Sequence, residues 1–354
     1  MCSSDLTVSE AAHQIKNKQL SPVDLAKSLL ERIDDTDQDL QAWVTIDREE
    51  VLTAAQQLED EAKEGHTRGP LHGVPIGLKD IFYTAGMKTA AGSKVYADFV
   101  PDFDATTVRK IKEAGGIILG KAVTTEFATS DPSPTYNPWN LEHTPGGSSS
   151  GSSVAVASKT VGAALGSQTG GSTCRPAGYN GIVGLKATYG RISRYGVVPV
   201  SWSLDHVGIL VRTVDDAALM LQVMSGEDKN DPGSANEVVP NFAEQMAEHN
   251  RPPRIGIVSQ YYQEKSTGEV WDHTQSVANK LADAGAEVVN LALPDSFGSC
   301  HSAQRIVMNV ECAAFHEHFH ATQAVNYGPR VRAGMSMLSL VPPSVCLQTS
   351  RFAL

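Results

Sequence analysis

Hydrophobic positions near the start of the chain recur at helical spacing and predict three helices. Thr7 and Glu10 form a capping-box pattern, and Ser21 precedes Pro22, a favoured pair for an N-cap and a first helical position. A third helix is predicted over residues 48–63, where apolar residues recur every three or four positions before Gly65.

Beyond these helices, strand-like and helical segments alternate. Short apolar runs bounded by glycine predict buried strands within 73–80 and 116–120, with a helix over 106–113 between them. Further on, residues 254–258 and 287–291 read as strands on either side of a helix over 269–284. This alternation predicts an α/β fold whose sheet is covered by helices on both faces.

Composition narrows the class of protein. The 354 residues are 41% hydrophobic and 19% charged, which favours a globular chain with a large core. No linker-like stretch or charge block divides the chain before residue 225, so we expect a single domain over residues 1–354. A net charge of −11 argues against direct binding to nucleic acid.

The cysteines and the N-terminus predict a cytoplasmic location. Five scattered cysteines without a C-x-x-C spacing fit a reducing compartment. The first residues lack the basic and apolar regions of a signal peptide, and no apolar run is long enough to span a membrane. We therefore expect a soluble protein without a membrane partner.

Residues 145–208 combine glycine and serine at unusual density. Two polar stretches, 146–153 and 166–172, alternate with apolar runs that a flexible linker would not carry. Glycine in such a setting indicates a close approach of backbones or of a ligand. The P-loop and dinucleotide-binding spacings are absent, which disfavours nucleotide binding; tight packing alone remains an alternative.

The order of these motifs resembles the amidase signature family. Gly146 to Ser149 is followed, 24 positions after Ser148, by Ser172 at the end of the Thr-Gly-Gly-Ser run 169–172. A lysine motif at 73–80 lies upstream, and the resemblance extends to about residue 330. It implies the amidase signature fold, a mixed twisted central sheet with helices on both faces, and hydrolysis of carboxylic amides without a cofactor or metal.

The resemblance implies a Ser-cis-Ser-Lys triad with Ser172 as nucleophile, Ser148 as proton shuttle after a cis peptide bond, and Lys79 as base. A serine hydroxyl needs an adjacent base, and lysine can serve only when burial or a cationic neighbour lowers its pKa. Lys79 follows an apolar strand, which suits burial, although a surface lysine at a strand end is the alternative.

Further residues are expected around this triad. Consecutive backbone N–H groups at Thr169, Gly170 and Gly171 can form an oxyanion hole. Ser149 is expected to hydrogen-bond within the same cluster, with loop capping as the alternative. Ser130 falls in the stretch 127–130, which lines the acyl pocket in the family.

The sequence departs from the family pattern at two positions beside Ser172. Gln168 stands where most members have aspartate, and Cys174 where most have arginine. A joint loss of two opposite charges is physically coherent, because one charge left alone and buried would be costly. We expect Gln168 to orient the loop by hydrogen bonding, Arg175 to lie beside the vacated position, and Cys174 to be a small buried hydrophobe.

Other polar residues suggest weaker candidates. His316 and His320 share a helix face, but without a third ligand at a recognisable spacing we expect a solvated face rather than a metal site. Asp205 and Arg191 are expected to be structural partners around the site.

Three functional hypotheses remain. The first is an amidase that converts a small-molecule amide to a carboxylate and ammonia or an amine through an acyl-enzyme. Such an amidase could form a homo-oligomer. The second is the glutaminase (A) subunit of a glutamyl-tRNA(Gln)/aspartyl-tRNA(Asn) amidotransferase, which the missing charges around Ser172 disfavour. The third is an inactive homologue acting as a binding protein, because residues 341–344 break the helical pattern where the family continues, and the chain is expected to lack the family's C-terminal part.

Overall fold

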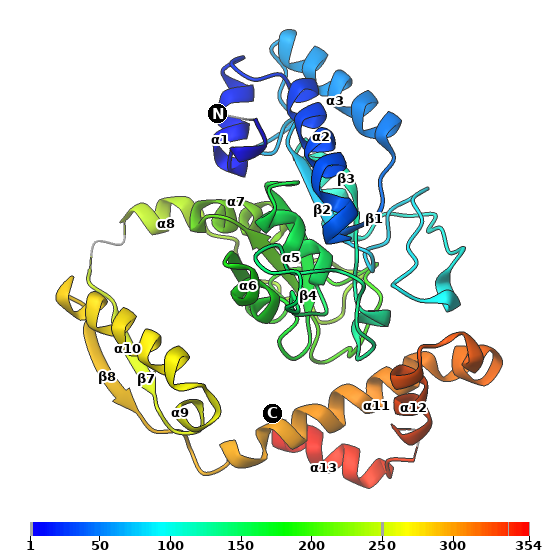
Figure 1. Ribbon diagram of the computed structural model, residues 1–354, viewed down its shortest axis with the longest axis vertical. Helices are drawn as coiled ribbons and strands as arrows, with labels where there is room; N and C mark the ends of the chain where they lie inside the picture. Colours follow the sequence, from blue (N-terminus) through cyan, green and yellow to red (C-terminus); the bar gives the residue numbers. More distant parts are fainter. Residues whose placement is uncertain (1–2, 249–250, 339, 354) are drawn as a thin grey trace.

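A six-stranded mixed sheet forms the centre of the computed structural model, which describes residues 3–248, 251–338 and 340–353 (Figure 1). The strands lie in the order β1-β3-β2-β4-β6-β5. Their bounds are β1 (Trp43–Thr45), β2 (Pro75–Lys79), β3 (Ile117–Ala122), β4 (Ala163–Gln168), β5 (Val183–Lys186) and β6 (His206–Val211).

The three central strands β3, β2 and β4 run parallel, whereas β1, β6 and β5 pair antiparallel with their neighbours. Every residue of the three parallel strands is buried, as expected for a sheet covered on both faces. Leu78 of β2 lies opposite Leu165 of β4, so the carboxyl ends of the two strands reach the same edge. This edge carries both the lysine motif and the start of the 169–172 loop.

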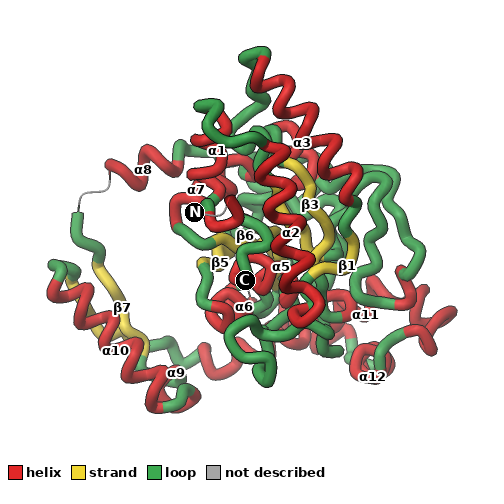
Figure 2. Tube along the Cα trace, turned by 45° about the horizontal axis from the view of Figure 1, so that its top comes forward, coloured by secondary structure: helices red, strands yellow, loops and turns green. Residues whose placement is uncertain are grey.

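Helices cover the sheet on both faces, which confirms the predicted fold class (Figure 2). The connections β2-α4-β3 and β3-α5-β4 cross the sheet in opposite directions, and right-handed crossovers then place their helices on opposite faces. The helices of this part are α1 (Val8–Lys16), α2 (Pro22–Leu40), α3 (Arg48–Lys63), α4 (Thr106–Glu113), α5 (Ser150–Ala157), α6 (Cys174–Asn180), α7 (Val214–Met224) and α8 (Phe242–Glu248).

The predicted helix starts are confirmed. Thr7 and Glu10 form the reciprocal hydrogen bonds of a capping box, and the Ser21 hydroxyl accepts from the N–H groups of Val23 and Asp24. Helix α3 has the bounds expected from its apolar period and buries Val51 among other residues.

The predicted β-α-β unit also forms, but as a separate two-stranded parallel sheet. It consists of β7 (Arg254–Val258), α9 (Tyr262–Lys265), α10 (Gly268–Asp283) and β8 (Glu287–Leu291), coloured yellow in Figure 1. The chain continues through the long helix α11 (Phe297–Gln323), α12 (Pro329–Leu338) and α13 (Pro343–Ala353).

Two glycines show why residues 145–208 are rich in this residue. A Cβ at Gly166 of β4 would lie 2.7 Å from the Ser149 Oγ, and one at Gly208 of β6 would overlap the side chain of Thr173. The segments around both serine-containing motifs therefore approach the sheet more closely than a larger residue would allow.

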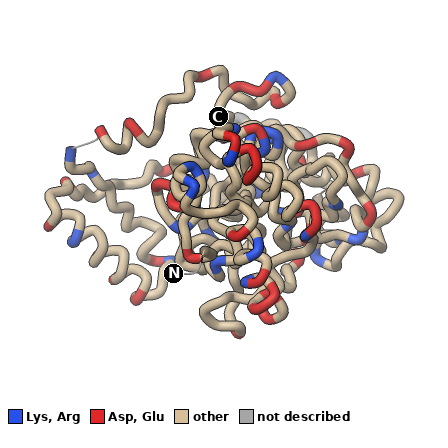
Figure 3. The backbone as a smooth tube through the Cα atoms, turned by 90° about the horizontal axis from the view of Figure 1, so that it is seen from above, with Lys and Arg blue, Asp and Glu red and all other residues tan. Residues whose placement is uncertain are grey.

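Basic and acidic residues are interspersed along the chain (Figure 3). Among the described residues, no helix combines the length and the apolar character needed to cross a membrane.

Candidate functional site

Lys79 lies at the end of β2 with its side chain fully buried. Its Nζ donates hydrogen bonds to the Ser148 Oγ at 2.7 Å and to the Ser167 Oγ at 2.8 Å. Burial lowers the pKa of this amine to about 7, while the negative charge of Asp205 acts in the opposite direction. A substantial fraction of Lys79 is therefore neutral near neutral pH, and the surface-lysine alternative is excluded.

Ser148 is fixed in the loop before α5, and its side chain is almost entirely buried. The peptide bond between Gly147 and Ser148 is cis, as the resemblance implied. The Ser148 carbonyl accepts from the Thr124 hydroxyl at 3.2 Å and from the Thr125 N–H at 3.3 Å. The hydrogen bonds to the Ser148 carbonyl thus fix the backbone that carries the hydroxyl contacting Lys79.

Ser172 ends the loop that follows β4 and is half-buried. Its carbonyl oxygen accepts from the Ser149 N–H at 3.3 Å, so the two serine motifs lie side by side. The hydrogen bonds of the described residues do not include one between the hydroxyls of Ser148 and Ser172. The structure therefore makes the Lys79–Ser148 contact and places Ser172 next to it without the second contact of the expected relay.

The 169–172 loop exposes its backbone near Ser172. Gly170 is exposed, and a Cβ built there would come no closer than 3.6 Å to another residue, the Gln304 Nε2 of α11. The Thr169 hydroxyl donates to Asp205 Oδ1, which fixes the start of the loop. The carboxyl group of Asp205 also accepts from the backbone N–H groups of Val200 and Ser201 at 2.8 and 3.0 Å.

Gln168 orients the segment that follows Ser172, as expected. Its Oε1 accepts from the N–H groups of Thr173 and Cys174, each at 2.9 Å, where α6 begins. A neutral amide oxygen thus satisfies two backbone donors at the start of that helix.

Replacing Gln168 by leucine is expected to lower the free energy of unfolding by about 2 kcal/mol, because two backbone donors lose their acceptor. Chemical denaturation of the variant and of the exposed-site control Gln245→Leu measures the effect. Equal stability of both variants and the parent would show that the Gln168 contacts are dispensable.

Cys174 was expected to be buried, and this prediction is wrong. The residue opens α6 and is exposed. Beside it, the Arg175 guanidinium Nε donates to the Gly147 carbonyl at 3.1 Å. Arg175 therefore links the segment after Ser172 to the peptide that precedes Ser148.

Ser149 and Ser130 lie in different settings. Ser149 is fully buried; its hydroxyl accepts from the Ser167 N–H at 3.2 Å and donates to the Ser167 carbonyl at 3.3 Å. Ser130 is exposed and lines a hollow of about 610 Å³ together with Gly147 and Arg175.

Ser167 and α11 are parts of the site that sequence reasoning missed. Ser167 contacts Lys79 from the neighbouring strand β4, and the sequence alone does not fix the pairing of β2 with β4. Helix α11 reaches the site through Gln304 and through Glu311, whose carboxylate accepts from Ser203. Neither α11 residue belongs to a glycine or serine motif, so no local signal marked them.

The histidine pair departs from expectation. His316 is fully buried rather than solvated; its Nδ1 lies 3.0 Å from the Tyr327 hydroxyl, and its ring packs against Phe127. Burial lowers the pKa of His316 to about 4. No group of three or more metal-ligating side chains occurs in the part of the chain that the structure describes.

The two residues expected to be structural partners behave differently. Asp205 contacts the 169–172 loop, as described above. Arg191 instead donates to the Val238 carbonyl at 3.0 Å.

Known proteins resemble this chain over most of its length. Residues 24–341 match the protein family described as Amidase. The glutamyl-tRNA(Gln) amidotransferase (A) subunit of Geobacter metallireducens is 42% identical over 296 residues, covering 82% of this chain and 61% of the relative. The same subunit of Desulfatibacillum aliphaticivorans is 35% identical over 353 residues, covering 93% and 72%.

Solved structures have the same fold. A structure described as revealing the evolutionary origins of an s-triazine catabolic enzyme superposes with a TM-score of 0.91 at 29% identity, covering 98% of this chain and 76% of that one. The peptide amidase of Stenotrophomonas maltophilia has a TM-score of 0.80 at 30% identity, covering 98% and 75%.

The chain spans 61% of the length of the Geobacter metallireducens relative. The family match covers most of the chain, and the motifs around Lys79, Ser148 and Ser172 lie within it. The chain therefore belongs to the amidase signature family.

Proposed function

We propose that the protein hydrolyses a carboxylic amide through an acyl-enzyme, with Ser172 as nucleophile, Ser148 as proton shuttle and Lys79 as base. The observation that carries this proposal is the Lys79 amine, buried and hydrogen-bonded to the Ser148 hydroxyl at 2.7 Å. An amine with a pKa of about 7 can accept a proton at neutral pH, which an ordinary lysine cannot.

In the first half of the reaction, the Ser172 Oγ attacks the amide carbon. Its proton passes to Ser148, whose own proton passes to Lys79. The C–N bond then breaks as the nitrogen takes a proton back along the same route and leaves as ammonia or an amine. In the second half, water attacks the acyl-enzyme and releases the carboxylate by the same proton transfers.

The oxyanion that forms on the substrate carbonyl is stabilised by backbone N–H groups of Thr169, Gly170 and Gly171. The exposed glycine backbone beside Ser172 supports this assignment, because it leaves room for a substrate. Each such donor is worth about 3 kcal/mol in the transition state.

Neighbouring residues support the triad. Ser167 holds the Lys79 amine from a second direction, and Ser149 ties the backbone before α5 to β4. Ser130 faces the hollow beside Gly147 and is assigned to the wall of the substrate pocket. The substrate is a small-molecule amide, and the protein acts in the cytoplasm as one domain.

A second candidate is the glutaminase subunit of a glutamyl-tRNA(Gln) amidotransferase. The observation that favours it is the 42% identity to the corresponding subunit of the Geobacter metallireducens enzyme. In that case the ammonia from glutamine passes to partner subunits rather than to solvent. Gln168 and Cys174, in place of a charged pair, favour the free-standing amidase.

Ammonia release from aliphatic, aryl and glutamine amides tests the proposal. We expect hydrolysis of at least one amide by the chain alone. Glutamine hydrolysis that appears only when the other amidotransferase subunits are added would support the second candidate. No ammonia from any amide, with or without those subunits, would contradict amide hydrolysis and leave the inactive homologue.

A further inference from the structure

Helix α11 is linked to the 200–205 loop by the carboxylate of Glu311. Its Oε1 accepts from the Ser203 hydroxyl at 2.7 Å, and its Oε2 accepts from the Ser203 N–H at 3.1 Å and from the Ser201 hydroxyl. One carboxylate thus satisfies three donors from two residues of the loop. This is a charge-assisted attachment rather than a single surface contact.

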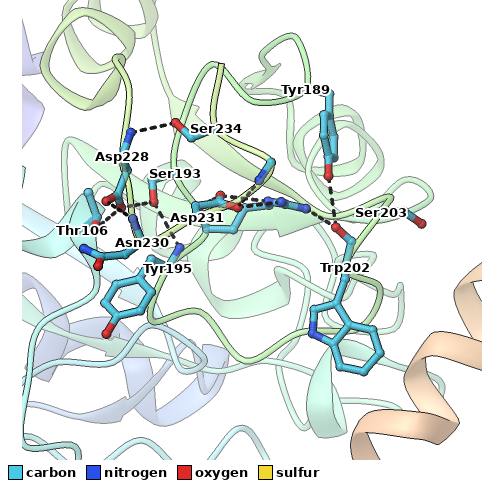
Figure 4. A network of polar contacts seen from close by, with 12 residues as sticks. Thr106, Tyr189, Ser193, Tyr195, Trp202, Ser203, Asp228, Asn230, Asp231 and Ser234 are labelled. Atoms are coloured by element: carbon cyan, nitrogen blue, oxygen red, sulfur yellow. Dashed lines mark hydrogen bonds and ion pairs between the residues drawn. The ribbon is translucent and has the colours of Figure 1, made fainter. Parts of the chain in front are cut away.

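The same loop is held from its other side by a polar network (Figure 4). The Trp202 carbonyl accepts from the Tyr189 hydroxyl at 3.1 Å and from the Arg194 guanidinium. Arg194 is in turn paired with Asp231 at 2.8 Å, and both side chains are mostly buried, with 14% and 4% exposed. The network thus holds the loop at Trp202, and Glu311 of α11 holds it at Ser201 and Ser203.

The 200–205 loop is hydrogen-bonded to the 169–172 loop, which carries Ser172, through Asp205. The N–H groups of Val200 and Ser201 bind Asp205 Oδ2, and Asp205 Oδ1 accepts from the Thr169 hydroxyl. Ser201 stands at the junction, because its hydroxyl meets Glu311 while its N–H meets Asp205. Three hydrogen bonds in series thus connect α11 to the first residue of the 169–172 loop.

A second contact brings α11 to the same loop directly. Gln304 lies seven residues before Glu311, which places both residues on one face of the helix. A Cβ built at Gly170 would lie 3.6 Å from the Gln304 Nε2. Helix α11 thus lies against the 169–172 loop.

We propose that Glu311 is a positioning residue, which holds the oxyanion-binding backbone of the 169–172 loop through Ser201, Asp205 and Thr169. The inference rests on the proposed function, because it assigns a catalytic purpose to the position of that loop. A displaced N–H donor weakens stabilisation of the transition state while leaving ground-state binding nearly unchanged.

The test measures covalent labelling of the full chain by an alkyl fluorophosphonate, whose phosphoryl oxygen occupies the oxyanion position. Glu311→Ala is expected to slow the limiting labelling rate about tenfold, a fraction of the effect of losing one donor, with the half-saturating concentration within about twofold. Glu311→Gln keeps an acceptor for the loop and is expected to retain at least about a third of the rate. Glu317→Ala, an exposed carboxylate on the same helix, is the matched control and should label like the parent.

A double-mutant cycle separates positioning from general structural damage. The Thr169→Val variant already lacks the hydrogen bond between Thr169 and Asp205. In this background, Glu311→Ala should slow labelling less than about twofold further. If Glu311→Ala does not fold, Ser203→Ala removes one of the three donors and should slow labelling about threefold.

Two results would overturn the inference alone: an unchanged limiting rate in a folded Glu311→Ala or Ser203→Ala variant, or effects of Glu311→Ala and Thr169→Val that multiply. Failure of the parent to label or to release ammonia would instead overturn the proposed function, and this inference with it.

Discussion

Replacing Ser172 by alanine is expected to lower the rate of ammonia release by at least about 10⁴-fold, because the proposed acyl-enzyme forms on the Ser172 hydroxyl. Ser172 is half-buried, so loss of its hydroxyl should leave the fold intact. Steady-state ammonia release, together with a thermal unfolding curve, measures both consequences.

The matched control is Ser130→Ala, because Ser130 lines the neighbouring hollow and is exposed. It should alter KM more than kcat if Ser130 contacts only the substrate. A Ser172→Ala variant that folds and keeps more than about a hundredth of the parent rate would contradict a nucleophilic role for Ser172.

The second large effect is expected at Lys79. Lys79→Met should lower kcat/KM by about 10²- to 10⁴-fold, the usual contribution of a general base. In the parent, Lys79 is active as a base only when neutral. Its pKa is about 7, so kcat/KM should rise with pH and level off above that pH. Burial lowers this pKa, and protonation below it therefore removes activity rather than adding it.

The pH limb can be assigned to Lys79 by changing its electrostatic neighbour. Asp205 raises the pKa of Lys79, so Asp205→Asn should move the acid limb to lower pH even as kcat falls. Arg194 and Cys312 are further ionisable groups that interact electrostatically with Asp205. Lys27→Met, at an exposed position on α2, is the control and should leave the limb in place.

An unmoved limb in Asp205→Asn would assign it to another group. Asp80 is the alternative, because burial raises the pKa of its carboxyl to about 7 beside the buried Lys121. The charge of Lys121 opposes that shift, so Asp205→Asn should move the limb much less if Asp80 rather than Lys79 is its source.

The elements of the fold could be predicted because their signals are local. Capping residues mark α1 and α2, apolar period marks α3, and short buried runs mark β2 and β3. Glycine-rich segments marked close packing, which Gly166 and Gly208 make explicit. The separation of β7 and β8 from the main sheet could not be predicted, because pairing between distant strands leaves no local pattern.

At the site, the motif residues could be predicted and their partners could not. Lys79 and Ser148 meet as expected, since both belong to ordered motifs. Asp205 was expected near the site, but Ser167 and Glu311 act through contacts between residues 88 and 110 positions apart, which one sequence does not encode visibly. The predicted exposure of Cys174 and of His316 was wrong, because the exposure of a helical residue depends on which face of its helix meets the core.

The most direct test of the central claim is to locate the fluorophosphonate adduct by mass spectrometry of peptides. We predict a single adduct on Ser172, formed as the Oγ–P bond replaces the P–F bond, fluoride leaves and the hydroxyl proton passes by way of Ser148 to Lys79. Its rate should rise with pH through about 7, in step with the neutral fraction of Lys79. An adduct on any other residue, or equal labelling of the parent and Ser172→Ala, would contradict the proposed triad.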